Sequence, residues 1–127
     1  MRYKQDRWGI LLVILFAILI LILSILPSDI SKESPRFFFR GMDKIIHAMM
    51  YGAFTYLALN EFLKNYAFRK RSFLIIIVAV FSYSVLMEIL QLYLVESRSG
   101  EWLDILANLT GIFVGLAVIL FREKIRS

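Results

Sequence analysis

Nine residues of this strongly hydrophobic chain have side chains that could bind a ligand or transfer a proton. They are Asp43, Lys44, His47, Tyr51, Glu88, Gln91, Arg98, Asp104 and Asn108. Histidine and carboxylates can act as general base and general acid, whereas lysine and arginine can bind phosphate groups. Charged groups are costly inside a membrane and persist there mainly with partners or a function. These nine residues therefore form the candidate functional site.

The spacing of Asp43, His47 and Tyr51 places these three residues on a shared helix face. Asp43, His47 and Tyr51 follow one another at intervals of four residues, and Lys44 adjoins Asp43. Residues four apart share one face of a helix, so Asp43 can accept a hydrogen bond from His47 or cap the helix. His47 is either a neutral imidazole bonded to a neighbouring helix or a group that transfers a proton or binds a ligand.

Glu88 and Gln91 are three residues apart and share a face of another predicted helix. Glu88 precedes Val95, the expected outer end of that helix, by seven residues, or roughly 10 Å at 1.5 Å per residue. A carboxylate at that depth is protonated, paired or facing water, and His47 and Arg98 are the expected partners. The alternative is a polar contact that only holds helices together, for which a less costly serine, asparagine or glutamine would suffice.

Asp104, Asn108, Gly111 and Gly115 form one stripe along the last apolar segment. Gly111 and Gly115 are a G-x-x-x-G pair, which predicts that another helix packs closely there. Asp104 lies in the first turn, where the helix dipole favours a carboxylate, so capping alone could explain it. Asn108 could simply form a hydrogen bond across helices.

The elements that carry these residues are long apolar segments. The chain has 127 residues, of which 60% are hydrophobic, against about 45–50% in soluble domains. A membrane-spanning helix needs about 20 mostly apolar residues, and the expected helices cover residues 9–26, 44–63, 72–95 and 102–121. We therefore predict an all-α, polytopic membrane protein with a bundle of four transmembrane helices in a single domain over residues 1–127. The first apolar run exceeds that of a signal peptide and lacks a cleavage site, so we expect it to be retained.

The distribution of charge predicts the orientation of the bundle. With a cytoplasmic N-terminus, ten of the 15 lysines and arginines lie inside and five outside, as the positive-inside rule expects. Both termini are then cytoplasmic, and the net charge of +5 reflects membrane orientation and anionic lipid rather than nucleic acid. The chain has no cysteine and no known catalytic, metal or phosphate-loop motif. One histidine with carboxylates could hold a divalent cation, but that set is too unspecific to predict a site. We therefore predict no metal and no cofactor.

The predicted topology also places two helix N-termini at the outer face, those of residues 44–63 and 102–121. Their unpaired N–H groups, together with Lys44, Arg40 and Arg98, suit an anion such as the phosphate of a membrane lipid. Asp43 and Asp104 compete for the same cations and dipoles. Membrane lipids are therefore the expected partners, and the sequence does not identify a protein partner.

Four motifs in this order resemble the VanZ-like family of small bacterial membrane proteins, along nearly the whole chain. They are Asp43-Lys44-x-x-His47-x-x-x-Tyr51, Glu88-x-x-Gln91, Arg98, and Asp104-x-x-x-Asn108-x-x-Gly111-x-x-x-Gly115. That family is named for a protein linked to resistance to the glycopeptide teicoplanin. The resemblance implies a multi-pass protein of the bacterial cytoplasmic (inner) membrane that acts at the cell envelope, and it brings glycopeptide resistance into consideration.

Three functions remain open at this stage. The leading hypothesis is a module that binds an anionic lipid headgroup or a lipid-tailed molecule in an outer-leaflet pocket, with Lys44 and Arg98 on the phosphate. The second is an intramembrane enzyme for a lipid-linked substrate, with His47 and Glu88 as base and acid and Arg98 stabilising developing charge. The third is a structural or assembly protein whose polar groups join helices.

Overall fold

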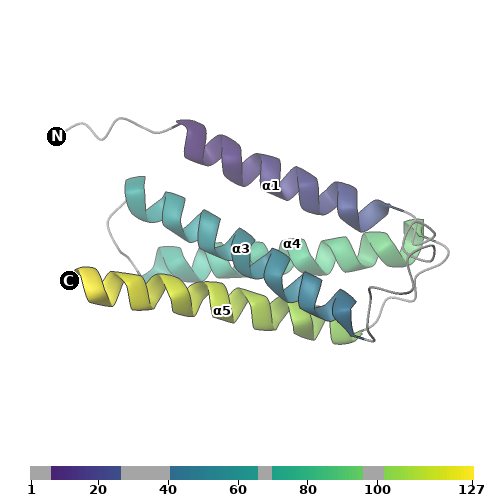
Figure 1. Ribbon diagram of the computed structural model, residues 1–127. Helices are drawn as coiled ribbons and strands as arrows, with labels where there is room; N and C mark the ends of the chain where they lie inside the picture. Colours follow the sequence, from purple (N-terminus) through teal and green to yellow (C-terminus); the bar gives the residue numbers. More distant parts are fainter. Residues whose placement is uncertain (1–6, 27–40, 66–69, 96–101) are drawn as a thin grey trace.

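The computed structural model describes residues 7–26, 41–65, 70–95 and 102–127. These ranges form four long helices, α1 (Arg7–Ile25), α3 (Met42–Asn65), α4 (Lys70–Leu94) and α5 (Trp102–Arg126). The helices lie alongside one another, and α3 and α5 run in the same direction (Figure 1). The all-helical prediction is confirmed for the described residues.

The helix ends lie close to those predicted, except at the end of α5. This helix continues to Arg126 rather than stopping at residue 121, although its last turns are charged. Arg122, Glu123 and Lys124 are good helix formers, and Glu123 lies 3.9 Å from Arg126 one turn later. Basic side chains are also favourable at a helix C-terminus because of the helix dipole.

Three of the described helices, α1, α4 and α5, are long and apolar enough to cross a membrane. The fourth, α3, has 24 residues but carries more polar and charged side chains, including Asp43, Lys44, Asn60 and Glu61. Its crossing of the membrane, and the cytoplasmic position of both termini, remain predictions from the sequence. The apolar helices nevertheless identify a membrane protein.

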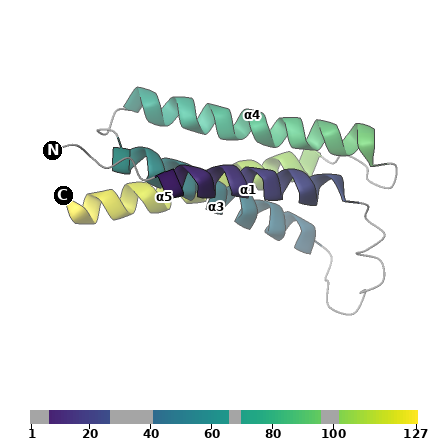
Figure 2. The ribbon, with the colours of Figure 1, turned by 90° about the horizontal axis from the view of Figure 1, so that it is seen from above.

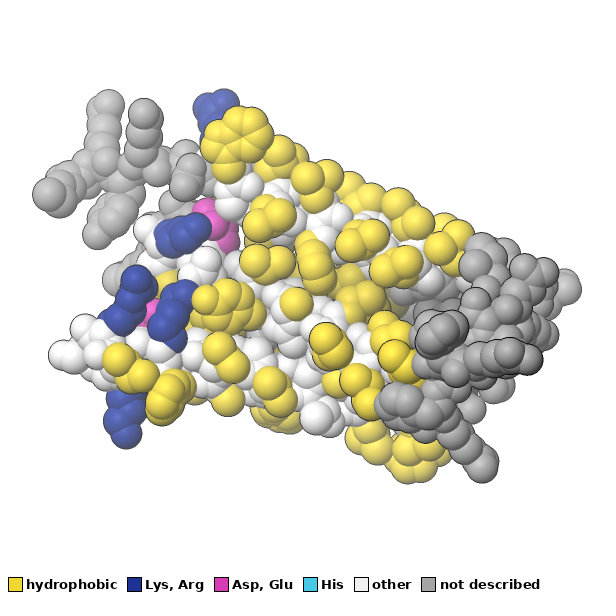
Figure 3. Space-filling model, in the orientation of Figure 1, with side chains coloured by type: hydrophobic (Ala, Val, Ile, Leu, Met, Phe, Trp, Pro, Cys, Tyr) yellow, Lys and Arg dark blue, Asp and Glu magenta, His cyan; other side chains and the backbone are white. Residues whose placement is uncertain are grey.

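The middle of the bundle, on the face that Figure 3 shows, carries mainly apolar side chains, as contact with lipid requires. Along α1 only Ile20 and Ser24 are buried, while Leu12, Ile14 and many similar side chains are exposed. In the same view, lysine and arginine side chains gather at the end of the bundle where α3 and α5 finish.

The closest packing joins α3 to α5 through small residues. A Cβ atom at Gly111 would overlap the carbonyl oxygen of Ala48, and one at Gly115 would lie 2.5 Å from that of Gly52. A Cβ at Gly52 would in turn lie 3.1 Å from the Gly111 carbonyl oxygen. The two backbones thus touch where side chains are absent, which is how small residues bring membrane helices together.

Helix α1 packs on α3 and α4 (Figure 2). Phe16 of α1 stacks on Phe54 of α3, with ring centroids 6.1 Å apart, and Phe54 contacts Tyr83 of α4. The Tyr83 hydroxyl donates a hydrogen bond of 2.6 Å to the Ala17 carbonyl of α1. A side-chain hydrogen bond to a helix backbone therefore fixes the position of an otherwise featureless apolar helix.

Replacing Tyr83 by phenylalanine is expected to lower the free energy of unfolding by about 0.5–1.5 kcal/mol, because it removes only this hydrogen bond. The midpoint of thermal unfolding in detergent measures the change. Ser82→Ala is the matched control, because Ser82 is the preceding residue of the same helix and its side chain is exposed. A Tyr83→Phe protein as stable as wild type would mean that the hydrogen bond contributes nothing.

Candidate functional site

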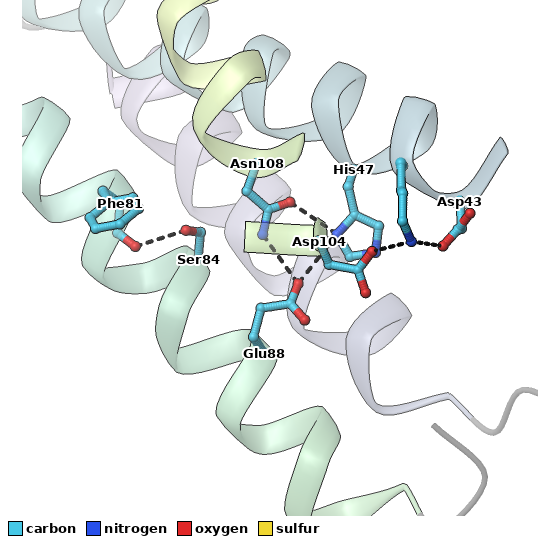
Figure 4. A network of polar contacts seen from close by, with 8 residues as sticks. Asp43, His47, Phe81, Ser84, Glu88, Asp104 and Asn108 are labelled. Carbon is cyan, nitrogen blue, oxygen red and sulfur yellow. Dashed lines mark hydrogen bonds and ion pairs between the residues drawn. The ribbon is translucent and has the colours of Figure 1, made fainter. Parts of the chain in front are cut away.

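Polar side chains from α3, α4 and α5 meet inside the bundle near the end where α3 and α5 begin (Figure 4). We call this group the polar cluster; its members are Lys44, His47, Glu88, Asp104 and Asn108. α3 contributes Lys44 and His47, α4 contributes Glu88, and α5 contributes Asp104 and Asn108. Residues from three helices, far apart in the sequence, are thus brought within contact distance.

Asn108 connects the two groups that sequence analysis assigned to acid–base chemistry. Its Nδ2 donates to Glu88 Oε1 over 3.1 Å, and its Oδ1 lies 2.9 Å from His47 Nδ1. Since an amide oxygen can only accept, this orientation of the amide assigns a proton to His47 Nδ1. His47 Nδ1 is also 3.4 Å from Glu88 Oε1, so the imidazole and the carboxylate are in direct contact.

Lys44 lies between two carboxylates at the mouth of the cluster. Its Nζ is 2.8 Å from Asp43 Oδ2 and 3.0 Å from Asp104 Oδ1. Partial burial raises the pKa of the Asp43 carboxyl, but the hydrogen bond and positive charge of Lys44 outweigh this and hold that pKa below its ordinary value. Asp43 thus pairs with Lys44, while His47 pairs with Asn108 and Glu88 rather than with Asp43.

Exposure falls steadily along this chain of polar groups. The side chain of Asp43 is 58% exposed, that of Lys44 27%, and that of Asp104 13%. At the inner end, Glu88 is 7% exposed and Asn108 is fully buried. A continuous polar route therefore leads from the end of the bundle into its interior, and the cluster is not a sealed core contact.

Two further candidate residues, Tyr51 and Gln91, each lie one helical turn from a member of the polar cluster. Tyr51 is buried in the apolar core with Phe54 and Ile112, and its hydroxyl has no hydrogen-bond partner among the described residues. Gln91 is buried one turn from Glu88, and its side chain makes no hydrogen bond to the cluster as described. Arg98, like Arg40, lies outside the residues that the structure describes.

An apolar groove lies on the surface of the bundle along the contact between α3 and α5. It has a volume of about 450 Å³, and its lining includes Ala48, Gly52, Gly111 and Gly115. No residue of the polar cluster lines the groove, but Ala48 is one helical turn from Lys44 on α3. Sequence reasoning expected close helix packing here and missed the groove. The small residues Ala48, Gly52 and Ala53 on α3, which face Gly111 and Gly115, could have predicted this groove.

A second polar group lies at the opposite end of α3 and α5. Arg122 Nη1 donates to Asn60 Oδ1 over 2.6 Å and to the Tyr56 hydroxyl over 3.0 Å. The guanidinium also stacks over the Tyr56 ring and contacts Glu123. These bonds engage Arg122 with side chains of α3, so the group joins α3 to α5. Sequence analysis did not identify it.

Comparison with known proteins gives one family match. A family model described as VanZ/LLP1 matches residues 3–123, nearly the whole chain. No curated protein sequence and no solved structure matches the chain. The resemblance drawn from the sequence motifs is thereby confirmed.

Proposed function

The chain belongs to the VanZ/LLP1 family, and from this premise we propose that it binds the anionic headgroup of an envelope lipid, or of a lipid-tailed molecule, at the polar cluster. The observation that carries the proposal is the nearness of a charged group at the end of the bundle to an apolar groove. Lys44 pairs with Asp104 over 3.0 Å, and the apolar groove on the surface of the α3–α5 contact starts at Ala48, one helical turn from Lys44. This combination matches an amphiphile, with its headgroup at the mouth and its tail in the groove.

The groups available at the mouth can bind a phosphate. Lys44 supplies an ammonium group, and the first turns of α3 and α5 supply backbone N–H groups and positive dipole ends. A phosphate oxygen can replace the exposed Asp43 carboxylate as a partner of Lys44. We assign Arg98 to the same role on the strength of the sequence. The groove volume lies within the roughly 300–1,000 Å³ typical of ligand-binding clefts.

The proposed setting is the bacterial cytoplasmic membrane, with α3 as a fourth span, both termini in the cytoplasm and the polar cluster at the outer leaflet. Resistance to a teicoplanin-type glycopeptide is the phenotype that the family name suggests testing. Sequestration or presentation of an envelope lipid headgroup would connect such a phenotype to the cluster.

A second candidate function, intramembrane acid–base catalysis, is favoured by one specific contact. His47 Nδ1 and Glu88 Oε1 lie 3.4 Å apart, within reach of a shared proton. In this alternative His47 removes a proton from a lipid-linked substrate or its attacking water, and Glu88 serves as the acid. Turnover of a lipid phosphate or ester would have to disappear in His47→Gln; turnover that persists there would remove His47 from the mechanism.

Native mass spectrometry of protein purified in mild detergent tests headgroup binding. We expect wild type to retain a phospho- or pyrophospholipid and Lys44→Gln to retain roughly tenfold less, since a hydrogen bond to a charged group contributes about 1.5–3 kcal/mol. Arg98→Ala is expected to act in the same direction. Lys64→Gln is the matched control, because Lys64 lies at the opposite end of α3 and pairs with Glu61.

Equal lipid retention by folded Lys44→Gln, Arg98→Ala and wild-type proteins would overturn the headgroup proposal. The midpoint of thermal unfolding, measured on each variant, shows whether it is folded. Glycopeptide susceptibility of cells that express each variant then reports whether headgroup binding has the phenotype suggested by the family name.

A further inference from the structure

Three residues of the polar cluster have the donor atoms of a metal site. One ring nitrogen of His47 and one carboxylate oxygen each from Glu88 and Asp104 all lie within 4.8 Å of one another. The side chains of Glu88 and Asp104 are only 7% and 13% exposed, and that of His47 is 12% exposed. The three ligands come from three different helices, so the fold rather than a local motif assembles them.

We propose that His47, Glu88 and Asp104 bind a divalent transition-metal cation of the zinc type. An imidazole nitrogen with two carboxylates is a donor set that suits Zn²⁺ or Co²⁺, whereas Mg²⁺ and Ca²⁺ prefer oxygen ligands alone. Three protein ligands leave one coordination position for water or for an oxygen of a bound molecule. Metal binding goes beyond headgroup binding and does not depend on it.

The distances within the cluster support this assignment. His47 Nδ1 and Glu88 Oε1 are 3.4 Å apart, close to the roughly 3.3 Å between two ligands of a tetrahedral zinc with bonds of about 2.0–2.1 Å. The cation takes the place of the Nδ1 proton, which lies toward the oxygens of Glu88 and Asn108. Asn108 donates to Glu88 Oε1 and acts as a positioning residue, as outer-shell hydrogen bonds do in metal sites.

Asp104 is the ligand that must move. The three donor atoms lie within 4.8 Å of one another, whereas two ligands of a tetrahedral metal with bonds of about 2 Å are roughly 3.3 Å apart. One ligand must therefore move closer by more than about 1 Å. Asp104 Oδ1 lies 3.0 Å from Lys44 Nζ, so the ammonium and the metal compete for one carboxylate. When Asp104 turns to the metal, Lys44 keeps Asp43 as a partner at 2.8 Å.

Because of this competition, replacing Lys44 should affect metal binding and lipid retention in opposite directions. Lys44→Gln removes the competing ammonium and is expected to strengthen metal binding several-fold, although the same change weakens retention of an anionic lipid. One variant therefore separates the two proposals, because failure of either leaves the expected result for the other unchanged. The polar route past Asp43 and Lys44 gives the cation access from the end of the bundle.

The test is a titration of Zn²⁺ into chelator-treated, full-length protein in detergent, followed by competition with a metal indicator. We expect one Zn²⁺ per chain, and a loss of affinity of at least about tenfold in His47→Gln and in Glu88→Gln, since even outer-shell changes cost roughly 10–100-fold. Glu123→Gln, at the opposite end of the bundle, is the control and should bind as wild type does. A large excess of Mg²⁺ should not displace the zinc.

The absorption spectrum of the Co²⁺-loaded wild-type protein gives a second readout that needs no variant to fold. Intense visible d–d bands of a low-coordinate site support the proposal, and they should be displaced by Zn²⁺. Absence of stoichiometric Zn²⁺ binding, a Co²⁺ spectrum of the hydrated ion, or binding that is unchanged in folded His47→Gln and Glu88→Gln would each overturn it.

Discussion

Gly111→Leu is expected to abolish the folded protein, with a cost in unfolding free energy of more than about 4 kcal/mol. Even a single Cβ atom at residue 111 would overlap the carbonyl oxygen of Ala48, and a leucine side chain extends well beyond its Cβ. The obstacle is backbone, which cannot rotate away as a flexible side chain can. Overpacking of a side-chain core typically costs about 1–3 kcal/mol, so a clash between backbones exceeds that range.

The measurement is the yield of monodisperse protein in detergent, followed by its thermal unfolding. Ala117→Leu is the matched control, because Ala117 lies on the same helix with its side chain exposed, where lipid can accommodate a larger group. If Gly111→Leu gives well-folded protein with the stability of Ala117→Leu, then α3 and α5 do not pack through Gly111 as described.

The contact at Gly111 shows how far the sequence specifies this fold. Hydropathy and length predicted the four helices, because the dimensions of a membrane impose long apolar segments. The spacing of Gly111 and Gly115 predicted close approach of a helix but not which one, since a G-x-x-x-G pair carries no information on its partner. Only the structure identifies α3, whose Ala48 and Gly52 supply the complementary small surface.

In the candidate site, too, the sequence predicted which residues share a helix face but not all of the partners that they contact. Sequence analysis expected His47 to face Glu88, and the two are in contact. It also allowed Asp43 to accept from His47, because residues four apart share a helix face. In the structure Asp43 pairs with Lys44, and Asn108 takes the position beside His47. Periodicity gives the face of one helix, whereas the rotation and depth of the neighbouring helices decide which side chains meet.

Asn108→Leu is expected to have the second large effect, because Asn108 is fully buried and bonds both the buried Glu88 and the partly buried His47. The substitution preserves the approximate volume but leaves His47 Nδ1–H and Glu88 Oε1 without the bonds of 2.9 and 3.1 Å that the amide makes. A buried donor or acceptor that loses its partner costs about 1–3 kcal/mol, and more when it is charged. We therefore expect a loss of about 2–4 kcal/mol of unfolding free energy, measured by thermal unfolding in detergent.

The same variant separates a functional cluster from interhelical contacts that only support structure. Thr110→Val is its control, because Thr110 is exposed two residues away and bonds only within its own helix, to the Leu106 carbonyl. If the cluster serves a ligand, Asn108→Leu protein that is still folded at low temperature should lose at least about tenfold in zinc affinity, because Asn108 orients Glu88. If Asn108→Leu is destabilised while zinc affinity and lipid retention both equal those of Thr110→Val, the amide only joins helices. That result would favour a structural or assembly role, whereas unaltered stability would contradict the hydrogen-bond network itself.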